Sequence, residues 1–223
     1  MRAPRYLLPL IASAALAVSA PAAGEWSRLP AAEFARLPEL QERIDPAHFD
    51  EALLSAAIFH ETNRVRRRLG LPLFKPLPKL DAAADLKAAA GVFEPELRHE
   101  SALPAIATPA DRIKSVGLDY RSIAENIARL PAYDLPEGVK QVGVRKRGGG
   151  EEYYRLDTGR ALELRTYESF AVYAVEGWMN SPGHRANIVN PALTSLGCAA
   201  RPCSAPISGH QQIYAVQVFF TPR

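Results

Sequence analysis

Three short polar motifs contain the side chains of this chain that are best suited to chemistry. His99 lies in "LRHES", Glu125 and Asn126 lie in "AENIA", and His184 and Arg185 lie in "SPGHR". We expect each motif at the boundary of a helix or strand, where chain ends bring polar side chains together at the mouth of a groove. Two imidazoles and a carboxylate can hold a divalent metal such as zinc and leave a position open for water or a ligand. Alternatively, each residue caps an element or makes a buried hydrogen bond, and spacing alone favours this second interpretation.

Other catalytic signatures are incomplete. The segment "HETNR" resembles the start of a zinc-peptidase motif, but Arg64 stands where the second histidine is required, so His60 is interpreted as a residue of the helix surface or its packing. The sequence has no GxSxG motif, and Ser101 lacks a recognisable oxyanion loop or triad partner. These patterns do not support a serine hydrolase.

The two cysteines, Cys198 and Cys203, lie in the short segment "GCAARPC". Their spacing is not CxxC and no second pair exists, so a metal site is disfavoured, although two free thiols are an alternative. We expect a small disulfide that pins a loop, as an oxidising compartment permits, with no catalytic role.

The first 23 residues predict an export signal. Arg2 and Arg5 precede an apolar run that ends near Ala20, and small residues follow. The run of about 14 residues is shorter than the roughly 20 that span a bilayer, which disfavours a membrane anchor. Export to the periplasm or the medium is therefore expected, with residues 24–49 as an N-terminal extension and 50–223 as the main domain.

Charge and composition narrow the class of partner. The formal net charge is +3, and it falls to +1 when Arg2 and Arg5 are removed with the signal. That balance provides no net attraction for nucleic acid. The basic clusters 64–68 and 145–147 are interpreted as solvated faces. The apolar content of 48% suits a globular domain, and the oligomeric state is left open.

The pattern of apolar residues and caps predicts helices first and strands last. An N-cap at Asp45 predicts a helix over 47–69, the Ala-rich segment predicts one over 81–92, and a capping box from Thr108 to Asp111 predicts one over 109–116 that Gly117 ends. Residues 129–165 alternate around three glycines and predict an inserted β-hairpin. The remaining expected elements are a helix over 167–180 and strands near 195–200 and 212–220. This order predicts an α+β fold.

The order of motifs resembles the CAP superfamily, the SCP domain of cysteine-rich secretory, antigen 5 and pathogenesis-related 1 proteins, in its bacterial branch. The resemblance covers nearly all of 50–223. It rests on "NRVRRRLGLPLF", the Ala-rich second helix, "LRHES", "TPADRIKSVGLDYRSIAENIA", "AVEGWMNSPGHRANIVNP" and "IYAVQVFF". The family implies a three-layer α-β-α sandwich, usually secreted, with a groove lined by two histidines and two glutamates.

The resemblance assigns site residues but also departs from the family pattern. His99 corresponds to the first groove histidine, and Glu125 corresponds to the glutamate of a Gly-Glu-Asn motif. Ala124 stands at the glycine of that motif. Ser181 stands where the second glutamate is expected, and aligning Gln217 with the family glutamine places Tyr214 at the second histidine. His184 is the substitute candidate.

The resulting hypotheses differ in chemistry. The leading one is a secreted protein that binds a small hydrophobic ligand or a cell-envelope component through a groove of His99, Glu125, Asn126, Ser181, His184 and Arg185. An alternative is a metal-assisted hydrolase, with zinc on His99 and His184 and Glu125 as the catalytic base. A third is an envelope protein-interaction module that uses the inserted hairpin.

Overall fold

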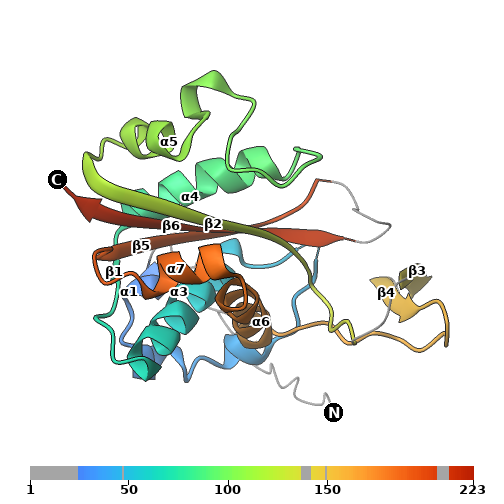
Figure 1. Ribbon diagram of the computed structural model, residues 1–223. Helices are drawn as coiled ribbons and strands as arrows, with labels where there is room; N and C mark the ends of the chain where they lie inside the picture. Colours follow the sequence, from blue (N-terminus) through green and yellow to red (C-terminus); the bar gives the residue numbers. More distant parts are fainter. Residues whose placement is uncertain (1–24, 47, 137–141, 149, 205–210) are drawn as a thin grey trace, which may run out of the picture.

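The computed structural model describes residues 25–223 except 47, 137–141, 149 and 205–210. A central sheet is covered on both faces by helices, which makes three layers in the order α-β-α (Figure 1). The α+β sandwich predicted from the sequence is therefore confirmed. The expected signal peptide lies outside the described residues. No described helix is long and apolar enough to cross a membrane.

The sheet has four strands in the order β1-β5-β6-β2. Their bounds are β1 Lys75–Pro76, β2 Tyr120–Pro131, β5 Ser195–Pro202 and β6 Gln212–Pro222. Strand β6 is central and pairs antiparallel with β2 and β5, whereas β1 adds one short parallel contact to β5. The C-terminal strands expected from β-branched and aromatic residues are both present, and β2 is an edge strand.

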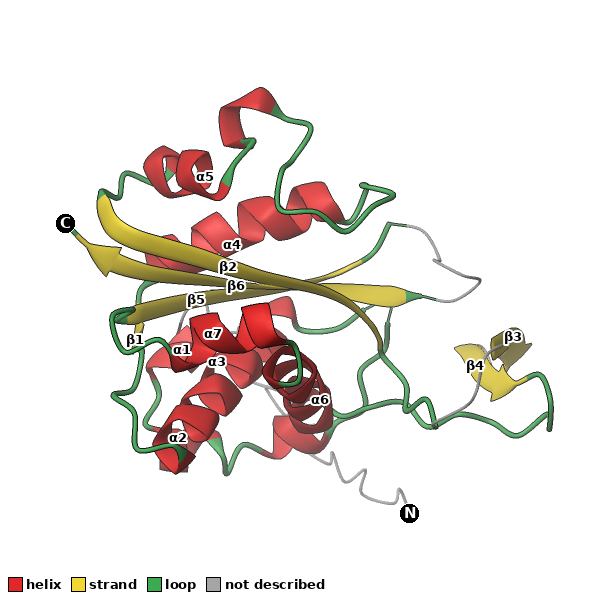
Figure 2. Cartoon of the chain, viewed as in Figure 1, coloured by secondary structure: helices red, strands yellow, loops and turns green. Residues whose placement is uncertain are grey.

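The lower layer consists mainly of α3 (Glu51–Arg68), α6 (Tyr167–Met179) and α7 (Pro182–Val189) (Figure 2). Helix α3 begins later than the expected residue 47, because Asp50 is the N-cap and its carboxylate accepts a hydrogen bond from Leu53 N–H at 2.9 Å. The Asp45 cap prediction was therefore wrong. Side chains of α3 and α6 form one hydrophobic core against the sheet.

The upper layer consists of α4 (Pro78–Gly91) and α5 (Pro109–Ser115). Helix α4 starts at Pro78, three residues before the predicted start, since proline is favoured in the first turn. The capping box predicted for α5 is confirmed, with Thr108 and Asp111 exchanging both hydrogen bonds. Gly117 follows with φ of 70°, as a helix stop requires. A second hydrophobic core lies between these helices and the sheet.

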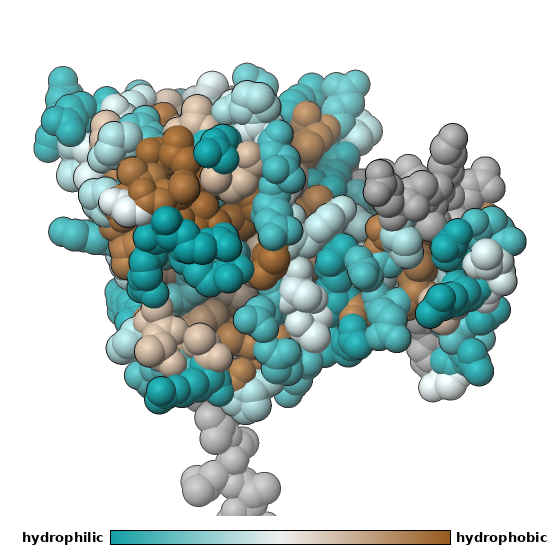
Figure 3. Space-filling view, turned by 60° about the horizontal axis from the view of Figure 1, so that its bottom comes forward, coloured by the Kyte–Doolittle hydropathy of each residue, from teal (hydrophilic) through white to brown (hydrophobic). Residues whose placement is uncertain are grey.

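The segment before α3 packs onto the lower layer. It contains α1 (Glu25–Arg28), α2 (Ala31–Phe34) and a 3₁₀ turn, η1 (Pro38–Gln41). Phe34, Leu40 and Ile44 are at most 4% exposed and belong to the lower core. Figure 3, which turns the bottom of Figure 1 forward, shows that a patch of apolar side chains surrounded by polar ones remains on this side of the molecule. The extension is thus part of the hydrophobic core, and it covers apolar side chains that α3 and α6 alone would leave exposed.

The insertion forms a two-stranded sheet of β3 (Val142–Arg147) and β4 (Gly150–Arg155) that projects beside the sandwich (Figure 1). The predicted hairpin is present in narrower bounds than 129–165, because residues 129–131 belong to β2 of the main sheet. Gly148 lies at its tip in a left-handed conformation of φ 60°. Its base is fixed by stacking of Tyr153 on Tyr133, with centroids 4.8 Å apart.

The two cysteines are free thiols, so the predicted disulfide is wrong. Cys198 packs in the lower core, whereas Cys203 packs in the upper core on the other face of the sheet. Successive side chains of a strand point to opposite faces, and five positions separate the two residues. The sheet itself therefore stands between the two thiols.

Candidate functional site

Glu125 and Asn126 lie in the middle of β2 and not at a boundary of an element, which corrects the prediction. Glu125 pairs with Val218 and Asn126 with Gln217 of β6. Ala124, at the place of the family glycine, is an ordinary strand residue. Glu125 and Asn126 are buried at 6% and 0% exposure, so each must find partners within the protein.

Glu125 joins His99 to the buried side chain of Arg112. Its Oε1 lies 3.0 Å from His99 Nδ1, and its Oε2 accepts a hydrogen bond from Arg112 Nη2 at 2.7 Å. Because an ionised carboxylate can only accept, the hydrogen bond to Glu125 is donated by Nδ1–H of His99. The His99 side chain is 44% exposed, while those of Glu125 and Arg112 are 1% exposed. The imidazole therefore faces solvent in an orientation that two buried groups fix.

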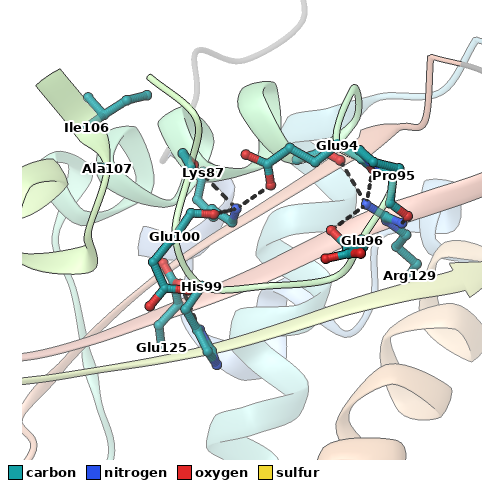
Figure 4. Close-up of polar contacts among 12 residues, drawn as sticks. Lys87, Glu94, Pro95, Glu96, His99, Glu100, Ile106, Ala107, Glu125 and Arg129 are labelled. Atoms are coloured by element: carbon teal, nitrogen blue, oxygen red, sulfur yellow. Dashed lines mark hydrogen bonds and ion pairs between the residues drawn. The ribbon is translucent and has the colours of Figure 1, made fainter. Parts of the chain in front are cut away.

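The segment that carries His99 is held by two cationic side chains. Arg129 of β2 donates to the carbonyls of Pro95 and Glu96 at 2.8 and 3.0 Å, and Lys87 of α4 donates to the carbonyl of Glu100 at 3.2 Å. Lys87 is fully buried and also pairs with a nearby glutamate at 2.8 Å. Figure 4 shows both cations pointing into the segment, with the imidazole against the carboxylate of β2. These bonds satisfy backbone groups of an irregular segment and restrict its movement.

A second network fixes α7 against β2. Asn126 Nδ2 donates to Gln217 Oε1 at 2.9 Å and to the carbonyl of His184 at 3.2 Å. Asn187 Nδ2 donates to Asn126 Oδ1 at 2.8 Å. Gln217 Nε2 continues the network to Thr62 Oγ1 of α3 at 2.7 Å. This network crosses from the helical layer to the sheet and sets the position of His184.

The motif "WMNSPGHRANI" turns the chain from α6 into α7. Pro182 occupies the first turn of α7, and Ser181 is at the N-cap position but makes no side-chain cap bond. His184 is half-buried, whereas Arg185 is exposed. Among the described residues, the partners of the Glu125 carboxylate are His99 and Arg112, and neither Ser181 nor Arg185 is one of them. The motif thus brings His184 to the site and leaves Arg185 at its solvent side.

The two histidines influence each other. Burial lowers the pKa of His184, and the charge of His99 lowers it further. His184 is consequently neutral above its lowered pKa and can act as a hydrogen-bond donor or acceptor. The hydrogen bond from Asn126 to the carbonyl of His184 places this residue beside the part of β2 where Glu125 contacts His99.

The side chains do not fit the three-residue metal site that the sequence predicted. Glu125 uses one oxygen for His99 and the other for Arg112, so it orients His99 and is not free to act as a metal ligand. Among the described residues, no three His, Cys, Asp or Glu side chains are arranged to hold a metal ion. Two imidazoles remain, fewer than the three protein ligands of known catalytic zinc sites.

Three cavities elsewhere are lined by other residues. One of about 160 Å³ lies between α2, α3 and α6 and is largely apolar, with Phe34 and His60 in its wall. A second of about 510 Å³ lies beside β5 and contains Glu51, Asp81 and Asp85. A third of about 660 Å³ lies near the C-terminus. The two histidines and the glutamate of the candidate site line none of these three.

Sequence reasoning missed four residues that build the site: Arg112, Asn187, Gln217 and Thr62. Gln217 had a visible signal, because it is a polar residue within the apolar strand "YAVQVFF" and so needs a buried partner. Arg112 had none, since an arginine in the first turns of a capped helix looks like a surface residue.

Residues 114–219 match the model of the CAP family, the cysteine-rich secretory protein family. The chain is 28% identical over 136 residues to the protein YkwD of Bacillus subtilis, an alignment that covers 61% of this chain and 38% of that protein. The chain therefore spans well under half the length of this relative.

Two solved structures are also similar. An extracellular protein of Bacillus anthracis that contains an SCP domain aligns with a TM-score of 0.49 and 22% identity, over 76% of this chain and 41% of that chain. An outer surface protein of Borrelia burgdorferi aligns with a TM-score of 0.49 and 15% identity, over 82% of this chain and 99% of that chain.

Proposed function

Because the chain carries a domain of the CAP family, we propose that it is an exported binding protein that holds an acidic group of a cell-envelope component at His99 and His184. The main support for this proposal is that Glu125, itself held by Arg112, fixes the orientation of the His99 imidazole. It presents an imidazole to solvent in one orientation, so little conformational entropy is lost when a ligand binds.

The charges around the site favour an acidic ligand. Glu125 is neutralised by Arg112, and exposed arginines adjoin both histidines in the sequence, Arg98 and Arg185. Glu96 and Glu100 are the exposed acids of the segment that carries His99. A carboxylate or phosphate would therefore meet imidazole and guanidinium donors together.

Apolar side chains on the same segment favour an amphiphilic component. Leu97 and Leu103 are 48% and 57% exposed on either side of His99 in the sequence, and Phe93 is 76% exposed. The apolar cavity of about 160 Å³ is smaller than the roughly 300 Å³ at which pockets for drug-sized ligands begin. An open site at His99 therefore accounts for the binding of an amphiphilic component better than this apolar cavity does.

The test measures binding to vesicles that contain phosphatidylglycerol, to phosphatidylcholine vesicles and to soluble peptidoglycan fragments. We expect binding to one of the two acidic sources and not to phosphatidylcholine, with at least a tenfold loss in the double variant His99→Ala/His184→Ala. His48→Ala is the matched control, because His48 is an exposed histidine far from the site in the sequence. Equal binding by the double variant, or no binding to either acidic source, would refute the proposal.

A further inference from the structure

Arg112 lies inside a cage of oxygen atoms. Its Nη2 donates to Glu125 Oε2 at 2.7 Å and to the carbonyl of His99 at 3.1 Å. Its Nη1 donates to the carbonyls of Ile106 and Ala107 at 2.9 and 3.3 Å. One carboxylate oxygen and three carbonyl oxygens therefore surround a guanidinium group on a side chain that is 1% exposed.

This donor set is the kind that binds hard metal cations. Calcium takes carboxylate and backbone carbonyl oxygens, whereas zinc prefers nitrogen and sulfur. A buried carboxylate also requires a nearby positive charge, since an unpaired buried charge is strongly destabilising. The cage would therefore attract a cation if the guanidinium were absent.

We propose that Arg112 is a built-in cation, which fills this oxygen cage in place of a metal ion and so organises the His99–Glu125 pair without one. The helix that carries Arg112 supports this role. The capping box of Thr108 and Asp111 fixes the start of α5, so the guanidinium enters the cage from a rigid element. Arg112 is a positioning residue, because it acts on His99 through Glu125. Arg112 fills this cage whichever ligand binds at His99.

The first experiment follows the thermal unfolding midpoint of the wild-type protein with EDTA and with millimolar calcium. We expect the same midpoint in both. A midpoint that falls in EDTA would show that a metal organises the protein, and it would overturn the proposal.

The second experiment removes the guanidinium. Arg112→Ala should lower the midpoint, and millimolar calcium or guanidinium ion should recover part of the loss. The double variant Arg112→Ala/Glu125→Gln should not respond to calcium, because the cage then lacks its carboxylate. Arg201→Ala is the control, since Arg201 pairs with Asp85 at the surface of another cavity. A wild-type midpoint in Arg112→Ala, or no recovery by either cation, would contradict the proposal.

A third comparison remains decisive if Arg112→Ala does not fold. Arg112→Lys keeps the charge, whereas Arg112→Met keeps most of the length of the side chain without the charge. We expect a higher midpoint for Arg112→Lys, together with the wild-type imidazole NMR signal of His99. A midpoint for Arg112→Met that equals or exceeds that of Arg112→Lys would show that the charge has no such role.

Discussion

The indole Nε1–H of Trp178 donates a hydrogen bond to the backbone carbonyl of Ile127 at 3.3 Å, two residues along β2 from Glu125. The same free edge of β2 is contacted by Asn187, whose Nδ2 lies 3.5 Å from the carbonyl of Glu125. Because β2 ends the sheet, its outward carbonyls need partners other than a strand. Helices α6 and α7 supply them beside the candidate site.

Trp178→Phe should destabilise the protein by about 1–3 kcal/mol, because the buried carbonyl of Ile127 loses its partner. Urea unfolding measures this change. Trp26→Phe is a matched control, since Trp26 Nε1 has no hydrogen-bond partner among the described residues. Equal losses in both variants would assign the effect to ring volume and contradict the role of the hydrogen bond.

Asn63 fixes the chain after α3, because its side chain exchanges two hydrogen bonds with the backbone of Phe74, at 2.8 and 3.0 Å. Asn63→Ala should cost about 2–4 kcal/mol of stability, since it leaves two buried backbone groups unpaired. Asn63→Asp keeps the acceptor but places a buried carboxylate oxygen against the carbonyl of Phe74, so at neutral pH it should be at least as unstable as Asn63→Ala. A loss below about 0.5 kcal/mol for Asn63→Ala would show that water replaces both bonds.

Asp81 makes stability depend on pH. Burial raises its pKa from 3.8 to about 6, although the hydrogen bond from Cys198 N–H opposes the shift. The folded state therefore holds the proton of Asp81 more tightly than the unfolded state does. The contribution of Asp81 to the free energy of unfolding is fully present below about pH 4 and is lost as the pH rises through 6. Asp81→Asn should match the wild type at pH 4 and exceed its stability by about 2 kcal/mol at pH 8. A stability difference that does not change between these pH values would exclude a raised pKa.

The positions of Cys198 and Cys203 predict that reductant has no effect on folding. Both thiols are at most 4% exposed, and burial raises the pKa of each. Ellman's reagent should label neither thiol in the native protein and both after unfolding in urea. A lower unfolding midpoint in dithiothreitol would instead reveal a disulfide.

Local signals allowed the helices to be predicted from the sequence. The capping box of Thr108 and Asp111 is read from four adjacent residues, and the structure reproduces it. The start of α3 was wrong because Asp45-Pro46 and Asp50 offer competing caps, and the structure uses Asp50.

The interior of the sheet was harder to predict. The segment "SIAENIA" has polar residues where a strand has its buried side chains, so Glu125 and Asn126 looked like boundary residues. Their partners Arg112 and Gln217 are 13 and 91 positions away in the sequence. Such pairs are set by tertiary packing.

The disulfide prediction failed for a related reason. Strand β5 continues to Pro202, and this extended chain sends Cys198 and Cys203 to opposite faces of the sheet. The short spacing of the two cysteines predicted a tight loop. The chain between them is instead an extended strand, because β5 pairs with β6 up to Pro202.

Imidazole NMR spectroscopy tests the proposed binding site most directly, because the chain has only five histidines. We predict that the acidic component that binds best shifts the signals of His99 and His184, and that their shifts persist in EDTA. His48 and His60 should be unchanged, since His48 is exposed elsewhere and His60 packs between two phenylalanine rings. Shifts at His48 or His60 with none at His99 and His184 would contradict the account.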